Sequence, residues 1–311
     1  MKKQLILLLA LALLLLPGCG AAATQEDTTL AVACTTYPVY LLTTAVADQV
    51  PDTTVDLVIN QQVSCLHNYT LTMADMKAIE GADLLVINGA GLEDFLSDAL
   101  EGRTCLDASQ GLELRWNDEE GEYDPHIWLD PVMAGQMMQN IAQGLSAADP
   151  EHRAQYETNA AVGAAQLAQL QTELKAELES LSMHQLITFH DGFSYFAHAF
   201  HLEIVASVEE EEGSEASARR IKELVGYIKQ YHLPSVFTEK NGSNSAANAL
   251  AQECGVSVYP LDMGMSGDGT GLAAYEALIR SNIDTIMEAY QRNQSNTKAV
   301  LWAVTAPVAC G

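Results

Sequence analysis

Three histidines and one aspartate in this chain stand where side chains of an α/β protein can meet around a metal ion. His67 lies in the loop after the segment TVDLVIN, His190 follows HQLITF, and Asp262 follows VSVYPL. His126 lies within DPHIWLDP, just before a predicted helix start. Imidazole nitrogen and carboxylate oxygen are ligands that zinc takes in four-coordinate sites, whereas manganese and iron sites use more carboxylate. The residue types therefore predict a metal site.

Two further side chains are candidate accessory ligands. Glu239 follows the predicted strand SVFT, and Cys65 lies two residues before His67. Cys65 also fits a disulfide or a free thiol. Taken singly, each histidine has another explanation. His67 could be solvated in a polar loop, and His126 could be a capping or packing residue. His190 could be a histidine of the core. Only the joint pattern points to a metal.

The elements that must position these residues alternate between strand and helix. Strands are predicted at residues 30–35, 54–60, 83–88, 184–189, 202–208, 235–238 and 256–261. Helical segments separate them, an alternation typical of parallel sheets covered on both faces. Ligands of such open sheets bind outside the carboxyl ends of the strands. We therefore predict an α/β fold with two lobes, each a mainly parallel sheet flanked by helices, and the metal site in the cleft between them.

One long helix is predicted between the two halves, from Asp149 to Leu181. Apolar or small residues recur at steps of three and four, namely at Tyr156, Ala160, Gly163, Leu167, Leu170, Leu174, Leu178 and Leu181. Asp149 is a good N-cap, and Pro150 suits the first helical position. Such a helix would be roughly 45–50 Å long, which favours a rigid strut between the lobes over a buried core element. The alternative, a coiled-coil partner helix, is disfavoured because the stripe lasts too few heptads and contains too much alanine.

Five parts of the chain follow from this pattern. They are a signal peptide (1–18), a tether (19–29), an N-terminal α/β lobe (30–148), the linking helix (149–183) and a C-terminal α/β lobe (184–311). The 311 residues suffice for two domains of ordinary size. The formal charge of −26 excludes nucleic acid as a partner, because phosphate binding requires Lys and Arg.

The N-terminal segment predicts export. Lys2 and Lys3 precede the apolar run Leu5–Leu16, which is too short to span a bilayer comfortably. The run ends in LPGC, which resembles the lipobox of bacterial lipoproteins and implies cleavage before Cys19 and a lipid on its sulfur. An ordinary secretory signal is the alternative. We expect a protein anchored to the cell membrane on its extracytoplasmic side.

Export permits disulfides, but their pairing is not fixed by spacing. The chain contains six cysteines, and lipidation of Cys19 leaves an odd number. The others are Cys34, Cys65, Cys105, Cys254 and Cys310.

Four segments carry a recognisable pattern: SCLHNYTLTMADMKAIEGADLLVINGAGLEDFL around His67, DPHIWLDP around His126, FHDGFSYFA around His190, and YPLDMG around Asp262. Together they resemble the zinc and manganese solute-binding lipoproteins of ABC transporters, called cluster A-I or cluster 9. The resemblance runs from about Ala31 to Tyr290. It implies that these three histidines and the aspartate are the metal ligands, and that an ABC permease is the partner.

The residue at position 190 bears on the choice of metal. Family members with glutamate at the corresponding place are generally linked to manganese, and those with histidine to zinc. The resemblance therefore implies Zn²⁺ as the transported ligand, with Mn²⁺ or Fe²⁺ as the alternative. The chain departs from many zinc members in one loop, where acidic residues 118–122 replace a histidine-rich stretch. The tail beyond residue 292 has no recognised counterpart.

Three functions remain open at this stage, all in a protein that we expect to be monomeric. The first is zinc capture for uptake, without enzymatic activity. The second is a metal-dependent adhesin. The third is a zinc hydrolase, which would need an open coordination position and a general base. HExxH is absent, so Glu239 or the run Glu209–Glu212 would have to be that base.

Overall fold

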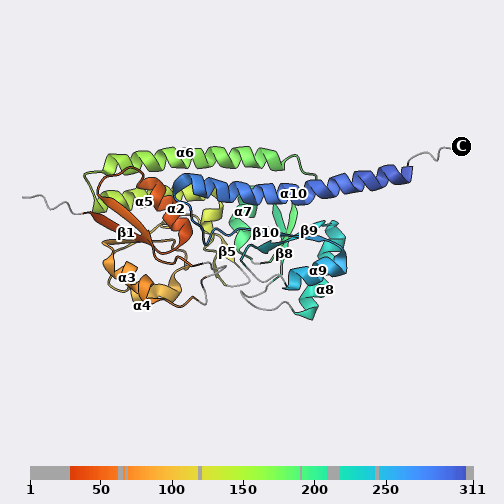
Figure 1. Ribbon diagram of the computed structural model, residues 1–311, viewed down its shortest axis with the longest axis horizontal. Coiled ribbons are helices and arrows are strands. Elements are labelled where there is room, and N and C mark those ends of the chain that lie inside the picture. Colours follow the sequence, from red (N-terminus) through yellow and green to blue (C-terminus); the bar gives the residue numbers. More distant parts are fainter. Residues whose placement is uncertain are drawn as a thin grey trace, which may run out of the picture.

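The chain forms two α/β lobes that lie side by side beneath two long helices (Figure 1), which confirms the predicted fold class. The computed structural model describes residues 29–61, 66, 69–117, 121–189, 191–208, 217–241 and 245–305, with side chains described up to residue 292. The signal peptide, Cys19 and almost all of the tether lie outside these residues, as do Cys310 and the run Glu209–Glu212.

Each lobe contains a four-stranded parallel sheet. The N-terminal sheet has the order β2-β1-β3-β4, and the C-terminal sheet the order β10-β9-β7-β8. The first is built from β1 (Leu30–Cys34), β2 (Thr53–Leu57), β3 (Leu84–Ile87) and β4 (Cys105–Asp107). The second is built from β7 (Gln185–Thr188), β8 (Glu203–Ser207), β9 (Ser235–Glu239) and β10 (Ser257–Leu261).

Helices cover these sheets, and local sequence explains where several of them begin. The N-terminal lobe has α2 (Tyr37–Val46), α3 (Met73–Gly81), η2 (Asp94–Leu96), α4 (Ser97–Leu100), η3 (Ile127–Leu129) and α5 (Pro131–Ala148). The C-terminal lobe has η4 (Asp191–Phe193), α7 (Ser194–Ala199), α8 (Ala218–Tyr231) and α9 (Ser245–Cys254). Thr72 caps α3: its hydroxyl accepts from the backbone N–H of Asp75, and the Asp75 carboxylate accepts from the backbone N–H of Thr72, which together form a capping box. Asp130 caps α5 ahead of Pro131.

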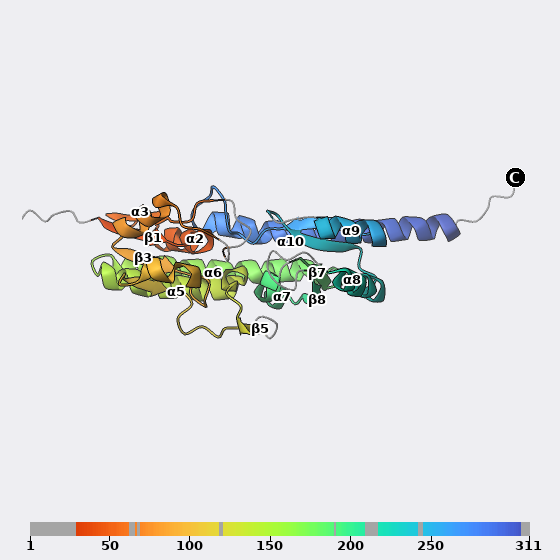
Figure 2. The ribbon, with the colours of Figure 1, turned by 90° about the horizontal axis from the view of Figure 1, so that it is seen from below.

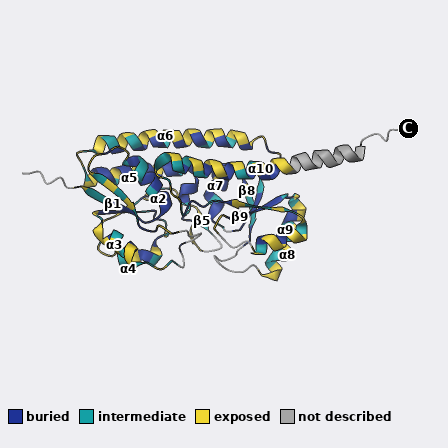
Figure 3. Cartoon of the chain, in the orientation of Figure 1, coloured by how far each residue is buried: buried dark blue, intermediate teal, exposed yellow. Residues whose placement is uncertain are grey.

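The linking helix α6 (Arg153–Leu178) buries the predicted stripe from Tyr156 to Leu178 and spans both lobes. Exposed and buried residues alternate along it in Figure 3, as expected of a helix with one face on the lobes. Its predicted start at Asp149 is wrong. Asp149 is the C-cap of α5, because the proline that follows it disfavours helical backbone at that position. The helix has 26 residues and is therefore about 39 Å long.

A second long helix, α10 (Gly271–Thr305), runs alongside α6 in both views (Figures 1 and 2). It begins against α2 of the N-terminal lobe, where the N–H of Gly271 donates to the Thr44 hydroxyl at 2.9 Å. It then follows α6, with Arg280 ion-paired to Glu173 and Glu177. The helix continues to Thr305, past the end of the C-terminal lobe (Figure 1).

The core consists of one large apolar cluster and one smaller one. The large cluster joins the N-terminal sheet to α5, α6 and α10 and reaches α7 in the other lobe. The small cluster lies between the C-terminal sheet and α8 and α9. Because the large cluster crosses from lobe to lobe, the lobes share a packed core at their junction.

A short antiparallel hairpin, β5 (Trp116–Asn117) and β6 (Glu122–Tyr123), was not predicted. It flanks residues 118–120 of the acidic loop, which lie outside the described residues. The rings of Trp116 and Tyr123 meet edge to face, with centroids 5.1 Å apart, and both side chains are exposed. An aromatic cross-strand pair is a recognised source of hairpin stability.

Candidate metal centre

The structure describes two of the four predicted metal ligands, His126 and Asp262, and the accessory candidate Glu239. His67, His190 and the other accessory candidate, Cys65, lie outside the described residues. Among the described residues, no group of three or more His, Cys, Asp or Glu side chains is placed to hold a metal ion. The geometry of the candidate centre therefore rests on how the loops bearing His126 and Asp262 are built.

His126 is held in place by Asp124. The carboxylate Oδ1 of Asp124 accepts from the backbone N–H of His126 at 2.9 Å and lies 2.8 Å from its ring Nδ1. Both side chains are largely buried. A carboxylate on Nδ1 fixes the tautomer and orientation of an imidazole, which suits it to bind a metal through its other nitrogen. The two residues form the donor arrangement expected of a zinc-binding histidine.

Replacing Asp124 by asparagine is expected to weaken zinc binding by about tenfold, because the neutral amide no longer raises the basicity of the His126 ring. Zinc titration of the metal-free variant measures the effect. Asp149→Asn is a matched control, since Asp149 Oδ2 lies 2.6 Å from Nδ1 of His152 in a second Asp–His pair at the start of α6. Equal zinc affinities in the two variants would show that Asp124 does not support a ligand.

The loop carrying Asp124 and His126 is fastened to the N-terminal sheet by a buried network. Asn88, directly after β3, donates its side-chain N–H to the carbonyl of Pro125 at 2.9 Å. Glu93 in turn accepts from the backbone N–H of Asn88 at 2.7 Å and from the Thr35 hydroxyl at 2.7 Å. Burial raises the pKa of Glu93 to about 7. The network links the ends of β1 and β3 to the residue preceding His126.

Glu93 lies just before the helical segment that follows β3. The helical segment begins at Asp94 as a 3₁₀ turn, and the Glu93 carboxylate turns back into the core. Gly89 explains why. Its φ of +82° is in the left-handed region, and its N–H donates to Glu93 Oε2 at 3.0 Å. A side chain at this position would also collide with Asp107.

Asp262 follows β10 directly and is fixed from several sides. Its backbone N–H donates to Asn282 of α10, and its carbonyl accepts from the same amide, both at 2.8 Å. Its carboxylate Oδ1 accepts from the Gly264 N–H at 2.8 Å. Its Oδ2 accepts from the Lys240 ammonium, also at 2.8 Å, and this contact raises the pKa of Lys240. Sequence reasoning missed Lys240, although it follows a strand end as the predicted ligands do.

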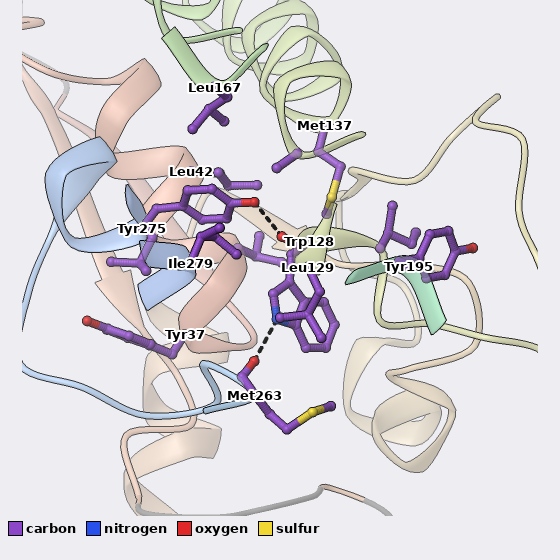
Figure 4. Packing of buried hydrophobic residues seen from close by; sticks show 14 of the residues in the cluster. Tyr37, Leu42, Trp128, Leu129, Met137, Leu167, Tyr195, Met263, Tyr275 and Ile279 are labelled. Atoms are coloured by element: carbon purple, nitrogen blue, oxygen red, sulfur yellow. Dashed lines mark hydrogen bonds between the residues drawn. The ribbon is translucent and has the colours of Figure 1, made fainter. Parts of the chain in front are cut away.

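Trp128 joins the two ligand loops. Its indole N–H donates to the carbonyl of Met263 at 2.8 Å, and its own carbonyl accepts from the Tyr275 hydroxyl of α10 at 2.6 Å. Figure 4 shows the indole pointing at Met263 and the phenol of Tyr275 pointing at the Trp128 backbone. Trp128 is two residues after His126, and Met263 is next to Asp262. The structure therefore ties these two predicted ligand loops together.

Glu239 is buried at the end of β9, where it is the register partner of Leu261. It stands beside Lys240 and one strand away from Asp262. Glu239 and Asp262 therefore lie at the same rim of the C-terminal sheet.

A cavity of about 340 Å³ lies beside Asp124. The hairpin lines one side of it and β8 another, and Asp124, Asp191, Ser194 and Arg220 contribute polar groups. The Asn117 side chain donates to Asp191 at 2.9 Å, so the hairpin of the N-terminal lobe touches the residue that follows position 190. The cavity is a polar space beside the residue that holds His126.

The family profile described as "ZnuA: Zinc-uptake complex component A periplasmic" matches residues 32–289. The chain is 30% identical over 312 residues to the zinc-binding lipoprotein AdcA of Streptococcus pneumoniae; the match covers 93% of the chain but 61% of that relative. It is 27% identical to the high-affinity zinc uptake system protein ZnuA of Bacillus subtilis, with 91% of the chain and 96% of that protein covered.

A solved structure supports the same relationship. The chain superposes on the laminin-binding protein Lmb of Streptococcus agalactiae with a TM-score of 0.72 and 28% identity, covering 82% of this chain and 98% of that one. That structure is described as a bifunctional protein with adhesin and metal transporting activity.

Proposed function

Because this chain belongs to the family of the periplasmic zinc-uptake component ZnuA, we propose that it captures Zn²⁺ outside the cytoplasmic membrane and delivers it to an ABC permease. The observation that carries the proposal is the joined pair of loops bearing His126 and Asp262. One loop presents a histidine whose Nδ1 is held by a carboxylate, and the other presents a carboxylate fixed by α10. An imidazole and a carboxylate on two joined loops would supply half of the ligands of a four-coordinate zinc site.

The proposed ligand set is His67, His126, His190 and Asp262, with Glu239 and Cys65 as accessory candidates. Three imidazoles and one carboxylate favour zinc over manganese, because manganese sites contain more oxygen ligands. The named relatives are zinc-binding proteins, which agrees with this choice. The matched family is a transport component, and we assign the chain no enzymatic reaction.

The proposed cellular arrangement follows the family and the N-terminal sequence. The family is periplasmic. Within the described residues, no helix combines the length and apolar character needed to cross a bilayer. We propose that residues 1–18 are removed, that a lipid on Cys19 anchors the monomer, and that residues 30–148 and 184–311 form the two lobes joined by the linking helix.

Titration of Zn²⁺ and of Mn²⁺ into the metal-free protein tests the function. We expect one tightly bound zinc ion per chain and weaker binding of manganese, because three of the four proposed ligands are imidazoles. Tighter manganese binding would overturn the choice of metal, and the absence of binding would overturn metal capture itself.

Adhesion is a second candidate function, favoured by the similarity to Lmb, whose description names both activities. An adhesive role would require binding of an extracellular matrix protein such as laminin to the intact chain. Binding that persists after zinc is removed would identify an adhesive surface independent of the metal.

A further inference from the structure

Lys240 and Asp262 are brought together by the register of two parallel strands. Lys240 is the first residue after β9, and Asp262 is the first residue after its neighbour β10. Glu239 and Leu261 are register partners, and the N–H of Lys240 donates to the Leu261 carbonyl at 2.9 Å. The sheet therefore places the Lys240 ammonium 2.8 Å from Oδ2 of Asp262, which is the proposed carboxylate ligand.

The two partners differ in how firmly they are held. The backbone of Asp262 is bound by Asn282, which is 1% exposed, and its Oδ1 by the Gly264 N–H. The Lys240 side chain is 63% exposed, against 20% for that of Asp262. A lysine ammonium on a flexible four-carbon stem can move into solvent at little cost. The ion pair therefore opens by movement of Lys240, while Asp262 stays in place.

A divalent cation bound by Asp262 meets the same ammonium. Two positive charges a few ångströms apart near a protein surface repel each other, and this repulsion opposes binding of the metal. If the Lys240 ammonium moves away, the repulsion is relieved, but the ion pair between Lys240 and Asp262 is lost. Either way, Lys240 lowers the affinity of the site for the metal.

We propose that Lys240 sets the affinity and the release rate of the zinc site. Its ammonium binds Asp262 Oδ2 and competes with the metal for that oxygen, so that it withdraws when zinc binds and returns as zinc leaves. This proposal rests on the proposed function, and in particular on Asp262 as a ligand. A protein that must hand its metal to a partner benefits from such a competitor, because affinity is adjusted mainly through the dissociation rate.

The test compares zinc release from the full chain into an excess of chelator. Lys240→Met is expected to slow release and tighten binding by about five- to tenfold, because the competing charge is gone. Lys240→Arg retains a cation and should resemble the unaltered protein. Lys222→Met is the matched control: it removes the same charge from an exposed position on α8, so its release rate should be unchanged.

A second measurement separates competition from a purely structural role. Metal-free Lys240→Met should unfold at a slightly lower temperature, while zinc should raise its unfolding temperature more than that of the unaltered chain. If Lys240→Met binds zinc stoichiometrically but releases it at an unchanged or faster rate, the role of Lys240 is overturned and the proposed function is not. Failure of the unaltered chain to bind zinc would overturn the proposed function. Unchanged affinity in Asp262→Ala would remove Asp262 from the ligand set, and the inference with it.

Discussion

Replacing His126 with alanine is expected to weaken zinc binding by more than a hundredfold. Removal of an outer hydrogen-bond partner of a ligand costs roughly 10- to 100-fold, and His126 is itself a proposed ligand. A hundredfold loss corresponds to about 2.7 kcal/mol of binding free energy. Calorimetric titration of the metal-free variant with zinc measures it. The Asp124 carboxylate, left without its imidazole partner, would add to the loss.

His152→Ala is the matched control for that result. His152 is also a histidine whose Nδ1 contacts an aspartate, but it lies at the start of α6. The neighbouring Tyr156 hydroxyl lies 2.8 Å from the Thr53 hydroxyl at the amino end of β2. Ligands bind at the opposite edge of such a sheet, beyond the carboxyl ends of its strands. Zinc affinity should therefore be unchanged in His152→Ala. Equal losses in both variants would show that the His126 effect is not specific to the site.

Trp128→Ala is expected to lower the free energy of unfolding by about 3–5 kcal/mol, because it empties a large, fully buried volume. The change also leaves the Met263 carbonyl without its indole donor. Urea unfolding of the metal-free protein measures the effect. Trp128→Phe keeps most of the packing and loses only the N–H, so an intermediate cost of about 1–3 kcal/mol is expected.

Trp116→Ala serves as the control for the buried tryptophan. Its side chain is 54% exposed on the hairpin, and surface substitutions of this kind usually change stability by about 0.5 kcal/mol or less. The ring contact with Tyr123 adds a further fraction of a kcal/mol. A Trp128→Ala variant no less stable than Trp116→Ala would show that Trp128 does not brace the junction of the lobes.

Patterns within one element were predictable, because they depend on residues close in sequence. The stripe of α6 follows from spacing alone, and the caps Thr72 and Asp130 follow from their local chemistry. The N-cap assigned to Asp149 failed for a local reason as well. Aspartate before proline suits a helix start, but this aspartate is already bound to the helix that precedes it, by its backbone N–H to the Leu145 carbonyl.

Contacts between distant segments were not predictable from the residues that make them. The Trp128–Met263 bond joins positions 135 residues apart, and the Lys240–Asp262 pair depends on the register of β9 and β10. Nothing in the residues of α10 indicates that this helix begins on the N-terminal lobe. The sequence placed candidate ligands at strand ends, and it could not show which neighbour each one would find there.

The side-by-side course of α6 and α10 has a mechanical consequence. A single rod between two bodies resists bending but leaves them free to twist about its axis. A second rod parallel to the first removes that freedom, and α10 is fastened both to α2 and to α6. Torsion of one lobe against the other would have to shear both helices and the core they share. Any movement at the proposed metal site is therefore left to short segments at the strand ends, with the two lobes serving as a fixed frame.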